Sequence, residues 1–139
     1  MEILYTSEVI ATGGVHGHVS AEGGALDIDV FAPSGVRDDE HKKTNPEQLF
    51  AASYASCLDA TLHHLAEAKQ LDVRDSEVKA KVKAVSVEKG DLRFALEVSL
   101  RLPNVSKEKG EKLLEEAYAN CPMSKATDGN IDVTVKLVE

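Results

Sequence analysis

Two cysteines, Cys57 and Cys121, are the residues of this 139-residue chain with the most distinctive chemistry. A cysteine thiolate is a nucleophile and a metal ligand, and two thiols that meet can alternate between a reduced form and a disulfide. Free cysteines are also common as small, inert, buried hydrophobes. Because the two positions are 64 residues apart, their spacing leaves both a redox pair and two inert core residues open.

Glu47 and the histidines are the other candidates for chemistry. Glu47 precedes Cys57 by ten residues, nearly three helical turns, so it could act on the thiol only through a bridging cation. A first-turn glutamate is also favoured by the helix dipole alone. Cys57 and His64 lie about 10 Å apart along a helix, too far for one zinc ion without other ligands, so we predict no metal site. The sequence also lacks a phosphate-binding glycine loop with its lysine and a Gly-x-Ser-x-Gly elbow.

The first cysteine lies in a segment that predicts a long helix over residues 45–69. Asn45 is a favoured N-cap, Pro46 suits the first helical position, and Gln48 occupies the capping-box place of Glu or Gln. Residues 49–58 carry no charge. The first half of this helix should therefore be buried nearly all round, which a single small domain cannot achieve without a partner subunit.

The second cysteine ends a shorter predicted helix, residues 107–120, before Pro122. Its apolar positions follow helical spacing: Leu114, Ala117, Tyr118 and Cys121. Both cysteines thus lie on apolar helix faces, and two buried helices in a small core tend to pack together. At a helix C-terminus the dipole disfavours a Cys121 thiolate, whereas Cys57, in mid-helix, receives no help from its own helix dipole.

Alternating apolar and polar residues predict strands around these helices. The predicted strands are residues 2–12, 16–20, 26–31, 77–87, 92–102 and 131–139, with turns at 13–14 and 88–91. The polar residues 32–44 predict a surface loop. Hairpins and helices in this order predict one α+β domain over residues 1–139, with two main helices and an antiparallel sheet rather than a βαβ unit.

Composition narrows the class of function. The formal net charge of −8 argues against binding to a nucleic-acid backbone, which needs clustered Lys and Arg. No apolar run approaches the ~20 residues of a membrane span, and the first residues lack the pattern of a signal peptide. We therefore expect a cytoplasmic protein, in which a permanent structural disulfide is not expected.

Two segments, TNPEQLFAASYASC (44–57) and CPMSKATDGNIDV (121–133), resemble the cysteine motifs of the Ohr/OsmC proteins, specifically the organic hydroperoxide resistance branch. The likeness extends from residue 4 through the final predicted strand. It implies an OsmC-like homodimer in which two long central helices are wrapped by sheet from both subunits. It also implies an oxidative-stress thiol peroxidase that reduces organic hydroperoxides without a bound cofactor and is recycled by external dithiols of the dihydrolipoyl type.

The resemblance assigns roles to individual residues. Cys57 matches the peroxidatic cysteine, Cys121 the resolving cysteine, and Glu47 the acidic residue that holds a catalytic arginine. In that chemistry a thiolate attacks the outer peroxide oxygen, and the resulting sulfenic acid condenses with the second thiol to a disulfide. The uncharged helix would supply an apolar pocket that selects alkyl or fatty-acid hydroperoxides over hydrogen peroxide. Its candidate lining residues are Phe50, Tyr54, Thr61 and Met123, the last in place of an aromatic residue.

The family arginine itself is replaced. It follows two glycines in relatives, whereas this chain has Val15 there, and Asp128 stands where relatives often carry arginine. We expect another cation beside Cys57: first Arg37, which Glu47 could hold by a bidentate pair, and second His16. A solvated Arg37 is an equal alternative. Two other functions stay open: an OsmC-like protein that binds an apolar or acyl ligand, and a structural dimer with inert thiols.

Overall fold

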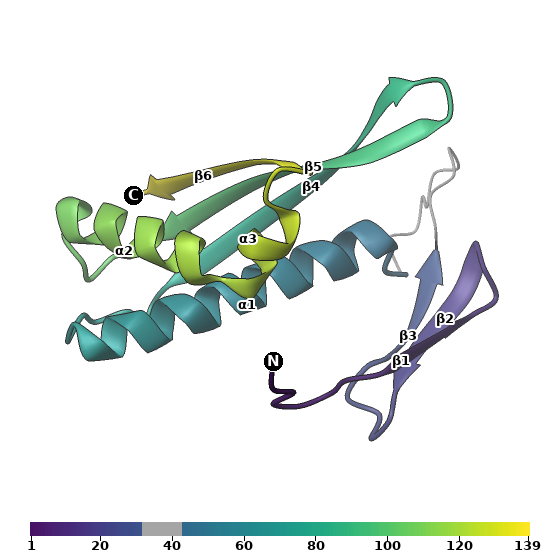
Figure 1. Cartoon of the computed structure of the whole chain (residues 1–139), viewed down its shortest axis with the longest axis horizontal. Helices are drawn as coiled ribbons and strands as arrows, with labels where there is room; N and C mark the ends of the chain where they lie inside the picture. The colour runs from purple at the N-terminus through teal and green to yellow at the C-terminus, as the bar shows by residue number, and fades with distance from the viewer. Residues whose placement is uncertain (32–42) are drawn as a thin grey trace. The chain divides into compact units, whose positions relative to one another are not determined.

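A computed structural model gives the fold and describes residues 1–31 and 43–139 (Figure 1). These residues form two compact units, Met1–Leu49 and Phe50–Glu139. The first unit contains three strands in the antiparallel order β1-β2-β3. Their bounds are β1 Val9–Thr12, β2 His16–Ala21 and β3 Asp27–Phe31.

The start of the first strand differs from the prediction. Residues 1–8 are outside any strand, although their β-branched and aromatic side chains favour one. Strand propensity reflects packing against neighbouring strands. Among the described residues, the pairing between β1 and β2 begins at Val9, which lies opposite Ala21. The predicted break at Gly13 and Gly14 is confirmed, because both adopt positive φ, 81° and 61°.

Helix α1 (Pro46–Ala68) confirms the predicted long helix. Its cap is in place, since the backbone N–H of Gln48 donates a hydrogen bond of 2.7 Å to Asn45 Oδ1. The Gln48 side chain does not close the expected capping box and instead accepts a 2.9 Å bond from the Thr44 hydroxyl.

One side of α1 is buried in the single chain. The buried positions recur every four residues: Tyr54, Leu58, Leu62 and Ala66. The opposite side exposes small residues: Ala52, Ser53, Ser56 and Ala60. That a partner subunit covers this second side stays a prediction from the sequence.

The second unit contains a three-stranded sheet of order β4-β5-β6. Its strands are β4 Glu77–Glu88, β5 Asp91–Arg101 and β6 Asp132–Val138. The predicted β4–β5 hairpin is confirmed, with Gly90 at φ 88° in its turn. However, β6 pairs parallel to β5, so the prediction of a wholly antiparallel sheet without a βαβ unit is wrong. Alternation along 131–139 indicates a strand but carries no information on the direction of its neighbour.

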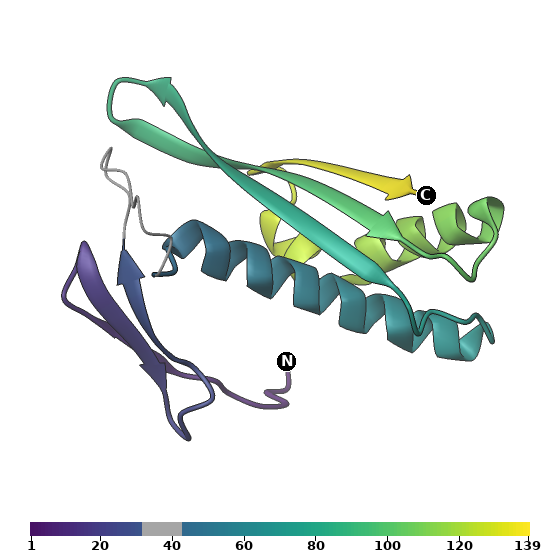
Figure 2. The same cartoon turned by 180° about the vertical axis from the view of Figure 1, so that it is seen from behind.

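Two helices make the crossover between β5 and β6: α2 (Lys107–Asn120), as predicted, and α3 (Pro122–Thr127), which was not predicted. Figures 1 and 2 show α1 and α2 on the same face of the sheet. That face supplies buried Leu96, Val98 and Leu100 to a cluster shared with both helices. The prediction that the cysteine-bearing helices pack together is therefore confirmed. Among the described residues, no helix is both long and apolar enough to cross a membrane.

Candidate functional site

Cys57 and Cys121, both free thiols, meet in the second unit. Cys57 lies in the middle of α1 and is partly exposed, whereas Cys121 is fully buried in the core cluster. The side chain of Cys121 interacts directly with the Cys57 thiol and helps to raise its pKa. The fold thus brings together two thiols that are 64 residues apart in the chain, which is the geometric condition for a redox pair.

The charge state of Cys57 is set by opposing influences. Burial is the largest and raises the pKa of the thiol, and the neighbouring Cys121 raises it further. The backbone N–H of Met123 acts on the sulfur in the opposite sense and lowers the pKa. Cys57 therefore receives help from a backbone dipole, which the sequence did not predict, although the net shift is upward.

The Met123 N–H reaches Cys57 because of how the chain turns at Cys121. Cys121 ends α2, where its N–H donates to Ala117 O at 2.8 Å, and it also caps α3, where its C=O accepts from Lys125 N–H at 3.1 Å. Pro122 occupies the first turn of α3, a position for which its fixed φ is suited. Cys121 thus lies at the C-terminus of α2, as predicted, and also begins a second helix, which the sequence did not predict.

A buried polar cluster lies beside the thiols. The Tyr54 hydroxyl and Ser124 Oγ form a hydrogen bond of 2.9 Å, and the Thr127 hydroxyl also interacts with Tyr54. Burial is the main cause of the raised pKa of Tyr54, and the hydrogen bond with Ser124 opposes it. Tyr54 is fully buried and belongs to the core, so its lining of a substrate pocket stays a prediction.

Three other residues, Phe50, Thr61 and Met123, are predicted to line the substrate pocket. Phe50 is partly buried, with its ring 5.5 Å from that of Phe94. The Thr61 hydroxyl donates to the backbone oxygen of Cys57 at 2.9 Å. The Met123 sulfur accepts a bond from the Ser53 hydroxyl at 3.7 Å. The role of these side chains in a substrate pocket also stays a prediction.

Glu47, in the first unit, has a buried carboxylate oxygen. Its Oε2 is buried and has no hydrogen-bond partner within residues 1–31 and 43–139. Arg37, its expected partner, lies outside the described residues. His16, the second candidate cation, is exposed in β2 with its ring 5.3 Å from that of Phe31. Val15 is 41% exposed.

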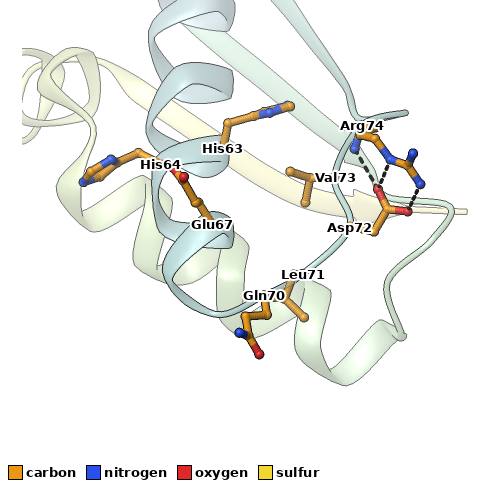
Figure 3. A pocket seen from close by; sticks show the side chains of 8 residues that line it. All are labelled: His63, His64, Glu67, Gln70, Leu71, Asp72, Val73 and Arg74. Carbon is orange, nitrogen blue, oxygen red and sulfur yellow. Dashed lines mark hydrogen bonds and ion pairs between the residues drawn. The ribbon is translucent and has the colours of Figure 1, made fainter.

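An open pocket of about 750 Å³ lies at the C-terminal end of α1 and the loop that follows (Figure 3). His63 and His64 line it and point to different sides of the helix. His63 is held by Ser76, 2.8 Å away, whose hydroxyl donates to Asp59. Both histidines are exposed. Because neither cysteine lines this pocket, it is separate from the thiol pair.

Comparisons with known proteins find relatives of this chain. The family model described as OsmC-like protein matches residues 38–136. The organic hydroperoxide resistance protein OhrA of Bacillus subtilis is 41% identical over 139 residues, which cover 98% of this chain and 97% of that protein. OhrB of the same organism is 36% identical over 135 residues, 96% and 98% of the two chains.

The fold has close matches among solved structures. The crystal structure of an organic hydroperoxide resistance protein from Elizabethkingia anophelis superposes with a TM-score of 0.89 at 36% identity, covering 100% of this chain and 99% of that one. The crystal structure of Bacillus subtilis OhrB gives 0.86 at 34% identity, covering 98% and 100%. The chain therefore belongs to the OsmC-like protein family, within which it is similar over nearly its whole length to the organic hydroperoxide resistance proteins.

Proposed function

We propose that this protein is a cysteine-based thiol peroxidase that reduces alkyl or fatty-acid hydroperoxides to alcohols. The observation that carries the proposal is the contact between a partly exposed Cys57 and a buried Cys121. A peroxidatic thiol must be reached by substrate, whereas a resolving thiol need only reach its partner. The names of the similar proteins, which concern resistance to organic hydroperoxides, support the same class of substrate.

The reaction follows from the two thiols. The Cys57 thiolate attacks the outer oxygen of ROOH, the O–O bond breaks, and the alkoxide takes a proton and leaves as ROH. Cys57 is then a sulfenic acid. The Cys121 thiol attacks its sulfur, forms the Cys57–Cys121 disulfide and releases water. An external dithiol, of the dihydrolipoyl type, reduces that disulfide by two successive exchanges and is itself oxidised.

A cation beside Cys57 completes the proposed site. Burial raises the pKa of the thiol, and only the thiolate reacts, so the Met123 N–H alone leaves a small reactive fraction. The buried Oε2 of Glu47, which has no hydrogen-bond partner in the part of the chain that the structure describes, is suited to one nitrogen of a guanidinium. We assign that role to Arg37 first and to His16 second.

The pKa of Cys57 shows which residue supplies the cation. It is measured from the pH dependence of Cys57 alkylation in wild type, Arg37→Ala, His16→Ala and Glu47→Gln. The variant that removes the cation should raise the pKa of Cys57 and slow peroxide reduction, and Glu47→Gln should act in the same direction because it releases the guanidinium. If Arg37→Ala leaves both the pKa and the rate unchanged, Arg37 is not the cation.

We also propose a homodimer as the active form. The single chain exposes large apolar side chains at its N-terminus and at the tip of the β4–β5 hairpin, namely Ile3, Leu4, Tyr5, Val87 and Leu92. Each of these two groups, and separately the exposed side of α1, is surface that a second copy would bury. Sedimentation at micromolar concentration should give a dimer, and a folded ~15 kDa monomer would contradict this. A cytoplasmic location remains a prediction from the sequence.

Thiol counting after addition of cumene hydroperoxide tests the function as a whole. Wild type should lose two thiols per chain rapidly and recover them with a dithiol. Mass spectrometry should then find a peptide pair linked through Cys57 and Cys121. In Cys121→Ser, Cys57 should instead accumulate over-oxidised forms. If wild type loses no thiols, the protein is not a peroxidase, and two alternatives are left: an OsmC-like protein that binds an apolar or acyl ligand, and a structural dimer with inert thiols.

A further inference from the structure

The buried polar residues of this protein gather at one place. Among the described residues, the buried polar ones are Ser124, 3% exposed, and Thr127, 4% exposed. Both belong to α3, and both side chains interact with the hydroxyl of fully buried Tyr54 on α1. The rest of the buried core is apolar, so this hydroxyl cluster is a local exception.

Stability alone does not explain such a cluster. A buried hydroxyl loses its hydrogen bonds to water, and the net gain from one internal bond is only about 1 kcal/mol. Replacing both partners of a buried bond by apolar groups of similar shape can be nearly neutral. A bond of this kind, however, has a fixed length and direction, and can hold two segments in one relative position.

The two segments held here are those that carry the thiols. Tyr54 precedes Cys57 by three residues on α1, and Ser124 follows Cys121 by three residues, so the bond lies within about one helical turn of each cysteine. The Thr127 hydroxyl donates to Met123 O at 3.0 Å and to Ser124 O at 3.2 Å, which braces the first turn of α3. That turn also carries the Met123 N–H directed at Cys57.

We propose that Tyr54 is a positioning residue, whose hydrogen bond to Ser124 holds Cys121 and the Met123 N–H against Cys57. The bond sets the effective concentration of one thiol at the other and the electrostatic environment of the Cys57 sulfur. Its importance for catalysis rests on the peroxidase function proposed above. Its effect on the thiol pair does not, because two positioned thiols close a disulfide with any suitable oxidant.

The test uses redox equilibrium without peroxide. The full-length protein is equilibrated with mixtures of reduced and oxidised dithiothreitol, in which protein dithiol and oxidised dithiothreitol convert to protein disulfide and reduced dithiothreitol. In Tyr54→Phe we expect the equilibrium constant for disulfide formation to fall about tenfold, a change of about 30 mV. Ser124→Ala should give the same fall, and the double variant no further loss, since both remove one interaction.

Tyr118→Phe is the matched control, because Tyr118 is a partly exposed tyrosine of α2 and also lies near Tyr54. It should leave the equilibrium constant unchanged. The pKa of Cys57, read from the pH dependence of alkylation, should rise in Tyr54→Phe as the Met123 N–H moves away. Urea unfolding verifies that each variant is folded.

Folded Tyr54→Phe and Ser124→Ala proteins with a wild-type equilibrium constant and a wild-type Cys57 pKa would overturn the proposal, as would equal losses in Tyr118→Phe. Additive losses in the double variant would also overturn it, because they would show that the two hydroxyls act separately. If the peroxidase function fails instead, wild-type protein will form its disulfide in dithiothreitol mixtures but will lose no thiols to cumene hydroperoxide.

Discussion

Closing the Cys57–Cys121 disulfide should stabilise the fold by an amount that follows from the positions of the two residues. The bond closes a loop of 64 residues. In the chain-entropy model, a loop of that length lowers the entropy of the unfolded chain enough to raise the free energy of unfolding by about 4 kcal/mol. The two thiols already meet in the reduced fold, so little of this gain should be lost to rearrangement.

Urea unfolding of the fully reduced and fully oxidised protein measures the gain. With a slope of about 2 kcal/mol per molar urea, typical of small proteins, about 4 kcal/mol moves the unfolding midpoint by about 2 M. Both forms are compared at the same protein concentration, because association would make the midpoint depend on concentration. Cys121→Ser is the control, since it cannot form the bond and should show one midpoint under both conditions.

One result would refute the reasoning. If mass spectrometry proves a complete Cys57–Cys121 bond and the oxidised protein unfolds at the same or a lower urea concentration, closing the bond strains the fold as much as it restrains the unfolded chain. The two thiols would then not be positioned for disulfide formation, and the contact between them would have to be a consequence of core packing only.

Three further predictions concern parts of the fold that position the site. Leu62→Ala, at a fully buried position of α1, should lower the free energy of unfolding by about 2–5 kcal/mol in urea; a loss below 1 kcal/mol would show that the core closes around the gap. The pKa of His18 is raised by its bonds to Asp29 and then Asp27. His18 therefore stabilises the first sheet below pH 6.5, and this contribution is lost as pH rises through its raised pKa. In the Asp29→Asn variant, NMR titration should show a lower pKa for His18 than in wild type. An unchanged His18 pKa would exclude the pairing of His18 with Asp29. Asn45→Ala should cost about 1 kcal/mol by loss of the N-cap, while Asn45→Asp should cost much less.

The elements that the sequence predicts well are those with a local cause. The cap at Asn45 and the uncharged run behind it define α1, and the apolar spacing before Pro122 defines α2 to the residue. Both signals act within a few residues, so no knowledge of the rest of the chain is needed. The Lys89–Gly90 turn of the β4–β5 hairpin is local in the same way.

The features that could not be predicted depend on partners distant in the sequence. Alternation in residues 131–139 indicates a strand, but its parallel direction follows from the crossover through α2 and α3. Pro122 was interpreted only as the end of α2, although a proline equally suits the first position of a new helix. That second possibility was a usable signal for α3, and with it for the Met123 N–H at Cys57.

The effect of Cys121 on Cys57 leads to a last prediction. In the reduced protein, burial first and then the neighbouring Cys121 thiol raise the pKa of Cys57. Removing the Cys121 side chain takes away its direct contribution and opens space through which water can reach the sulfur, and both changes lower that pKa. Cys121→Ala should therefore alkylate at Cys57 faster than wild type at pH 7, although it has lost one of the two thiols and cannot form the disulfide.

The alkylation rates of Cys57 in Cys121→Ala and in wild type show whether Cys121 activates Cys57 or restrains it. If Cys121 were needed to activate Cys57, its loss would slow alkylation. Mass spectrometry of the alkylated peptide keeps the measurement specific to Cys57, and Cys57→Ser supplies the background rate from Cys121. Slower or unchanged alkylation in Cys121→Ala would contradict the argument. Faster alkylation would mean that the resting dithiol restrains its own nucleophile. Activation would then have to come from the Met123 N–H and from a cation held by Glu47 Oε2, which has no hydrogen-bond partner among the described residues.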